Sequence, residues 1–123
     1  MVGNKTLQRY YAEYNRRYFG NSLPKCKTVW ADLEKLSEGA VGHYRPVEYE
    51  RFDGKRWHHY RTDHLIEIDP KLRSMNTIWQ STLLHEMAHL SVGLRHKKVV
   101  SHGKIWQQEM LRLATAGAFK NLW

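Results

Sequence analysis

The stretch Leu83-Leu84-His85-Glu86-Met87-Ala88-His89 decides the fold, because it places the pattern H-E-x-x-H inside a long apolar segment. Side chains four positions apart lie one above the other on a helix, so His85 and His89 would share one face. Glu86 would then point toward the open side of any ion that both imidazoles bind. The pattern is typical of helices that bind zinc and carry the general base of a hydrolytic reaction.

The residues around this pattern favour a buried helix. Residues 76–84 contain neither glycine nor proline, Asn76 is a suitable N-cap, and Gly93 is a suitable stop. Apolar side chains occupy most sides of the segment, which predicts a helix at the centre of a small domain. The alternative is a buried helix with two structural histidines, but Glu86 would then be a buried charge without an obvious partner.

A catalytic zinc site usually has three protein ligands and one open position, so a third ligand must come from elsewhere in the chain. His102 is the first candidate, because it precedes Gly103 and opens a segment with helical apolar spacing. A histidine at a helix start can be directed back at the metal, and glycine lets the backbone pass close by. Residues 94–101 are long enough to bring this second helix beside the first.

Spacing alone leaves other ligands open. His96 is the main alternative, and Glu109 is the candidate if a glutamate of a following helix binds the metal. The metzincin pattern fails in register, because it requires glycine and histidine where the chain has Val92 and Arg95.

A zinc ion at this place would make a water molecule reactive at neutral pH. Glu86 would take the proton of that water and later pass it to the leaving amine, which predicts hydrolysis of a peptide bond. Metal-bound histidines usually donate their second nitrogen to a carboxylate or a carbonyl. Asp32, Glu67 and Asp69 are the candidates for that role.

Six segments of the chain match a known family in their order: Tyr14 to Phe19 with Leu23-Pro24, Val29-Trp30, Gly39 to Gly42, Ile66 to Leu72, Leu83 to His89, and His102 to Met110. In this order they resemble the SprT-like family of zinc metallopeptidases, which includes the Spartan-type DNA–protein crosslink proteases. The resemblance implies a Zn²⁺ site formed by His85, His89 and His102, with Glu86 as the general base. For such a peptidase we expect accessible, extended protein segments as substrates, with DNA-associated proteins among the candidates.

The chain departs from that family in one respect. Many relatives carry a C-terminal zinc ribbon with paired C-x-x-C motifs, whereas this chain has a single cysteine, Cys26. We therefore expect residues 1–123 to form one SprT-like metallopeptidase domain without a zinc ribbon. The resemblance carries over the peptidase core and not a role in crosslink repair.

The remaining pattern predicts an α+β fold of the zincin-like (minigluzincin-like) type. We expect an N-terminal helix over residues 5–19, a small antiparallel sheet, the motif helix, and a last helix over residues 103–115. We expect four extended segments to form the sheet: 27–33, 40–52 with an interruption at Pro46, 55–60 and 64–68. Asp53-Gly54 predicts a two-residue hairpin turn between the middle two. A strand along the site could pair with an extended peptide.

The charge of the chain indicates a polyanionic partner. The net charge is +8, from 20 lysines and arginines against 12 acidic residues, and nucleic acid is the usual partner of such a small basic domain. Aromatic residues such as Trp57 and Tyr60 accompany basic ones and could stack on unpaired bases of single-stranded DNA. An alternative function is therefore a zinc-containing nucleic-acid-binding module without peptidase activity. The simplest alternative is that the charges only form a solvated basic surface.

Several classes of protein are excluded by composition. The chain has no run of about twenty apolar residues, so we expect no membrane span. Residues 1–5 lack the apolar core of a secretory signal, and one cysteine cannot form an internal disulfide. We therefore expect a cytoplasmic protein that is a monomer.

Overall fold

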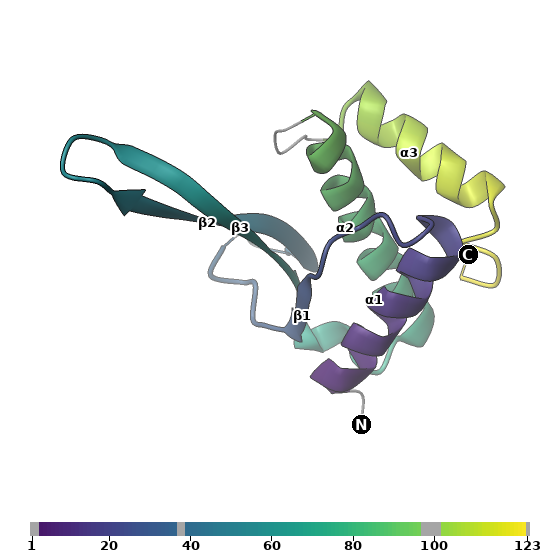
Figure 1. Ribbon diagram of the computed structural model, residues 1–123. Helices are drawn as coiled ribbons and strands as arrows, with labels where there is room; N and C mark the ends of the chain where they lie inside the picture. Colours follow the sequence, from purple (N-terminus) through teal and green to yellow (C-terminus); the bar gives the residue numbers. More distant parts are fainter. Residues whose placement is uncertain (1–2, 37–38, 97–101, 123) are drawn as a thin grey trace.

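The computed structural model describes residues 3–36, 39–96 and 102–122. They form an α+β fold in which three α-helices pack with a three-stranded sheet (Figure 1). In chain order the elements are α1 (Asn4–Tyr18), β1 (Lys27–Trp30), β2 (Gly42–Phe52), β3 (Trp57–Ile68), a 3₁₀ turn η1 (Pro70–Leu72), α2 (Asn76–His96) and α3 (Lys104–Thr115). The predicted α+β class and order of elements are confirmed.

The sheet has the strand order β1-β3-β2, which corrects the expected antiparallel arrangement. β2 and β3 are antiparallel, but β1 and β3 are parallel. β3 takes the central position, and its Ile66 and Ile68, which share one face of the sheet, are both 0% exposed. The hairpin therefore returns the chain to the side of β1, and β2 is left at an edge of the sheet.

β2 and β3 extend well beyond the short β1 as a two-stranded hairpin that projects from the body of the protein (Figure 1). The two segments expected at 55–60 and 64–68 are one continuous strand, β3. β2 continues through Pro46, which an edge strand tolerates because it has a free side. The hairpin itself is confirmed.

The hairpin turn is longer than the predicted two residues. Phe52 pairs with Trp57, so four residues connect the strands. The carboxylate of Asp53 accepts hydrogen bonds from the backbone N–H groups of Lys55 and Arg56 at 2.8 and 2.9 Å. This side-chain contact closes the wider loop, and the two-residue prediction was wrong because it considered only the Asp-Gly pair.

α2 is the central helix, as predicted, and lies between the sheet and α3 (Figure 1). Its fully buried side chains are Leu83, Leu84, Met87, Ala88, Leu90 and Val92. Its first turn is fixed by Trp79, whose ring makes edge contacts with Tyr10 and Trp30. The predicted stop at Gly93 was wrong, because α2 continues to His96. A helical glycine costs only about 1 kcal/mol, and the packing of α2 offsets this.

Among residues 3–36, 39–96 and 102–122, no helix is long and apolar enough to cross a membrane.

Candidate metal centre

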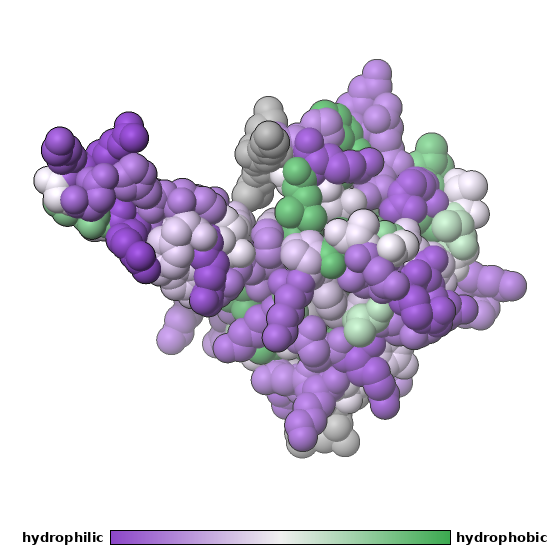
Figure 2. Space-filling model, viewed as in Figure 1, coloured by the Kyte–Doolittle hydropathy of each residue, from purple (hydrophilic) through white to green (hydrophobic). Residues whose placement is uncertain are grey.

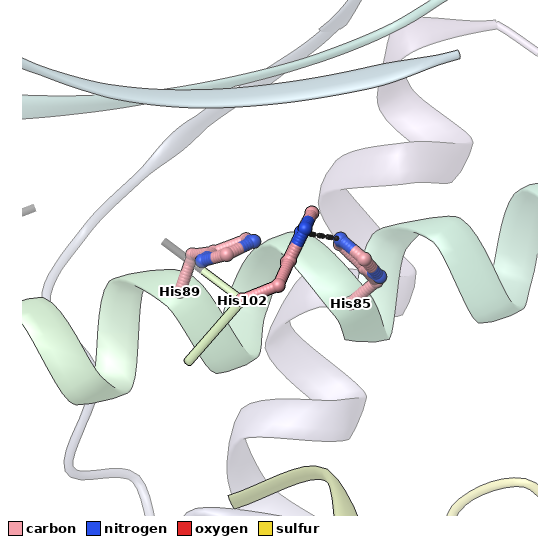
Figure 3. A group of neighbouring side chains, drawn as sticks. All are labelled: His85, His89 and His102. Atoms are coloured by element: carbon pink, nitrogen blue, oxygen red, sulfur yellow. Dashed lines mark hydrogen bonds between the residues drawn. The ribbon is translucent and has the colours of Figure 1, made fainter. Parts of the chain in front are cut away.

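Three histidines from two parts of the chain meet beside α2. His85 and His89 lie one turn apart on this helix, with ring centroids 5.0 Å apart. His102 lies just before α3, and its ring centroid is 4.8 Å from that of His85 and 4.7 Å from that of His89 (Figure 3). α2 holds the first two imidazoles, both half-buried, on a rigid element, and the approach of α3 brings the third.

The donor atoms of these histidines are spaced for a single ion. One ligand atom from each lies within 4.8 Å of the others, and the Nε2 atoms of His85 and His102 are 2.9 Å apart. Three nitrogens at about 2.1 Å from a tetrahedral ion would be roughly 3.4 Å from one another. The three histidines could therefore hold a metal ion, and a set of imidazoles suits zinc among other transition metals.

The electrostatics of the site keep His85 in the form that binds metals. Burial, together with the neighbouring His89 and His102, lowers the pKa of His85 to about 4. The ring is therefore neutral near pH 7, as metal coordination requires. Its Nε2 lies 3.8 Å from a carboxylate oxygen of Glu86, and this is not an ion pair because the imidazole carries no charge.

Glu86 is a buried carboxylate at the same site. It is 6% exposed, and burial raises its pKa to about 7. It lines a pocket of about 420 Å³ whose other walls come from the start of β2, from α2 and from the C-terminal part of the chain: Gly39, Ala40, Val41, Gly42, Ser81, Thr82, His85, His102, Met110 and Phe119. Two of the three histidines and the candidate base therefore share one cavity.

Gly42 allows β2 to run directly beside this carboxylate. A Cβ atom at position 42 would lie 2.6 Å from Cγ2 of Thr82 and 3.0 Å from Oε2 of Glu86. A side chain here would collide with α2, so the close approach of strand and helix requires glycine. Sequence reasoning noted residues 39–42 only as a matching segment, because nothing local shows which helix a strand will approach.

Trp106 of α3 is a second residue whose place sequence reasoning missed. Its ring centroid is 4.5 Å from that of His102 and 4.7 Å from that of His85. It also stacks on His89 at 5.3 Å with an interplanar angle of 20°. The indole therefore packs against all three imidazoles. The signal was its position four residues after His102 at a helix start.

The alternative ligands do not join the group. His96 is the exposed last residue of α2 and is not among the described side chains that meet at the site. Glu109 is buried instead against Ser91, whose hydroxyl donates to its Oε2 at 2.6 Å.

The proposed carboxylate partners of the histidines are also engaged elsewhere. Asp69 accepts from the N–H groups of Leu33 and Lys71 at 3.0 and 2.9 Å. Glu67 pairs with Arg45, and Asp32 accepts from the N–H of the residue two positions on. That prediction was therefore wrong, because these side chains serve the sheet and its loops.

The fold and the site define a class of α+β proteins in which a buried helix and a following helix bring three histidines to one point. Within this class the chain belongs to the SprT-like family, whose model matches residues 7–121. This confirms the resemblance seen in the sequence and suggests a metallopeptidase-like role. The chain matches none of the curated proteins and none of the solved structures with which it was compared.

Proposed function

We propose that this chain is a zinc-dependent endopeptidase, a single metallopeptidase domain of zincin-like fold. The observation that carries the proposal is the meeting of three imidazoles, with ligand atoms within 4.8 Å of one another, and a buried carboxylate that shares a cavity with two of them. In this proposal His85, His89 and His102 hold Zn²⁺ and Glu86 is the catalytic base. Membership of the SprT-like family supports it.

The zinc ion and Glu86 would have separate roles in the hydrolysis. Zinc, when bound, supplies Lewis-acid polarisation of the scissile carbonyl and lowers the pKa of a water. Glu86 takes the proton of that water and delivers it to the leaving amine. Gly42 lets β2 run close beside this carboxylate, because a Cβ atom at position 42 would lie 3.0 Å from Oε2 of Glu86 and 2.6 Å from Cγ2 of Thr82.

The substrate would bind as an extended chain. Gly39 to Gly42 line the cavity, and β2 is an edge strand of the described sheet. An edge strand offers unpaired main-chain groups, and a peptide that pairs with them is held without reading its side chains. We therefore propose that the substrates are accessible, extended segments of proteins, including proteins bound to DNA.

The test is Glu86→Gln, assayed for zinc content and for cleavage of an unfolded protein. Zinc content should persist, while cleavage should fall by about 10²–10⁴-fold, the usual contribution of a general base. Glu67→Gln is the matched control, because this carboxylate faces Arg45 and not the cavity, and it should cleave normally. Unchanged cleavage by Glu86→Gln would refute the assigned base.

A second candidate function is binding of single-stranded nucleic acid, and the hairpin tip favours it. Phe52 and Trp57 pair there at 5.3 Å yet remain 51% and 65% exposed, next to Lys55 and Arg56. Exposed aromatic rings beside cations can stack on unpaired bases. Figure 2 shows that the projecting hairpin is mostly hydrophilic on the face in view.

Two other basic side chains are already in ion pairs. Arg16 pairs with Glu13, and Arg61 pairs with Asp63. The hairpin tip is therefore the first place at which to test nucleic-acid binding. Trp57→Ala should weaken binding of a labelled oligo-dT without changing peptide cleavage, and salt should weaken wild-type binding steeply. Binding that is the same in Trp57→Ala would remove the tip from the interface.

A further inference from the structure

Glu109 is a buried ionisable group that the proposed chemistry does not use. It lies on α3 and is 3% exposed. Its Oε2 accepts a hydrogen bond from the Ser91 hydroxyl at 2.6 Å and lies 3.3 Å from the guanidinium of Arg95. Its Oε1 accepts from Nε of Arg112 at 2.5 Å. One carboxylate therefore connects two residues of α2 with one of α3.

The network also reaches the first helix. Arg112 donates through its Nη1 to the backbone carbonyl of Tyr18 at 2.9 Å, and its guanidinium lies over the ring of Phe19 at 5.2 Å. Three helices thus converge on Glu109. Such a fully partnered buried charge fixes the relative positions of the groups that it joins, because any shift leaves charges unpaired in a poorly solvated place.

These contacts lie next to the histidines along both helices. On α2, Ser91 and Arg95 follow His89 within two turns. On α3, Trp106, Glu109 and Leu113 follow the spacing of one helix face, and Trp106 packs against the rings of the three histidines. The face of α3 that Glu109 holds against α2 is therefore the face that adjoins His102.

We propose that Glu109 is a positioning residue for the metal centre. It clamps α3 to α2, and by this contact it keeps the imidazole of His102 at the point where His85 and His89 meet. The inference rests on the proposed function only in taking these three histidines as the zinc ligands. Glu109 is not one of the three residues that could hold the metal. It would therefore act on zinc affinity through the position of His102.

The experiment measures zinc affinity by competition with a chromogenic chelator in four proteins that form a cycle. These are the wild type, Glu109→Gln, His102→Ala and the double variant. Glu109→Gln keeps the size of the side chain and removes the charge that faces Arg95 and Arg112. We expect about tenfold weaker zinc binding, as for other residues that orient a ligand. In the His102→Ala background the same change should alter affinity by less than about twofold, since coupled residues are not additive.

A purely structural role is separated by a matched variant. Asp69 is also a buried carboxylate, 5% exposed, but it bonds the backbone of Leu33 and Lys71. Asp69→Asn should lower the melting temperature and leave zinc affinity within about twofold of wild type, because the hydrogen bonds of this carboxylate go to backbone groups outside α2 and α3. If Glu109→Gln does not fold, Ser91→Ala removes one hydrogen bond to the clamp and should weaken zinc binding by about threefold.

The outcomes distinguish the two proposals. Normal zinc affinity in folded Glu109→Gln, or an equal loss with and without His102, would overturn the positioning role while the zinc centre stands. A wild-type protein that retains no zinc would overturn the centre itself, and the role of Glu109 with it.

Discussion

Glu86 on α2 and Glu109 on α3 are both buried, 6% and 3% exposed, but their surroundings differ. Burial raises the pKa of Glu86 to about 7. Burial also acts to raise the pKa of Glu109, but hydrogen bonds from Arg112 and Ser91 and the charges of Arg112 and Arg95 hold it below its usual value. The comparison shows that burial does not decide what a carboxylate is for. Its partners do, and a buried carboxyl in a cavity whose pKa is strongly shifted is a candidate functional group.

Among these predictions, we expect the largest effect from a substitution that disturbs the tight packing around Glu86, and the quantity affected is the cleavage rate. Gly42→Ala places a Cβ atom 2.6 Å from Thr82 and 3.0 Å from Glu86, so strand or carboxylate must move. A shift of about 1 Å at a reacting group can cost about 100-fold in rate. We therefore expect cleavage by Gly42→Ala to be about 100-fold slower, with unchanged zinc content.

A partial rescue checks this cause. Thr82→Ser removes the Cγ2 atom that the new Cβ would meet first, so Gly42→Ala with Thr82→Ser should recover part of the cleavage rate. Steady-state cleavage of one unfolded protein by the three variants measures it. Full activity in Gly42→Ala would show that the strand need not approach Glu86 so closely.

The two glutamates should also affect stability with opposite signs. In zinc-free protein, Glu86→Gln removes a buried charge and should raise the free energy of unfolding by about 1 kcal/mol. Glu109→Gln leaves two arginines without their carboxylate and should lower it by about 2 kcal/mol. Urea denaturation at pH 7 measures both. Equal signs would contradict the contrast between the two surroundings.

The contrast between these glutamates also shows what the sequence can predict. The i, i+4 spacing of His85 and His89 is a local property of a helix, and the apolar residues around it require that helix to be buried. His102 could be predicted because it opens a helix with helical apolar spacing. The SprT-like segments indicated the same three histidines, so the meeting of these side chains, which could hold a metal ion, was predictable from local patterns and from the family together.

The parts that failed depend on tertiary contacts. β1 pairs in parallel with β3, whose Ile66 and Ile68 are fully buried, and no local pattern of the sequence shows which strand a segment will pair with or in which direction. α2 passes the expected stop at Gly93 because packing outweighs a small local preference. The role of Glu109 depends on Ser91, 18 residues earlier, and only the packing of α3 on α2 brings them together.

Acid should remove the contribution of Glu109 to stability. Its pKa is lower in the folded protein than in the unfolded chain, so its stabilising effect is present above the unfolded value, about 4.3, and is lost as pH falls through the folded value. The difference in unfolding free energy between wild type and Glu109→Gln should therefore be constant near pH 7 and shrink in acid. Urea denaturation from pH 7 to pH 3 tests this, and a difference that stays constant would contradict it.

The two arginines around Glu109 should give the smallest and most graded effects. Arg112 donates to Glu109 at 2.5 Å and also to the Tyr18 carbonyl, whereas Arg95 approaches to 3.3 Å with 56% of its side chain exposed. Arg112→Ala should therefore cost about 1–2 kcal/mol of stability, because a charged hydrogen bond is lost. Arg95→Ala should cost about 0.5 kcal/mol or less, as for exposed ion pairs. Urea denaturation of both variants measures the order, and a larger cost for Arg95→Ala would place the main counter-charge of Glu109 on α2 rather than on α3.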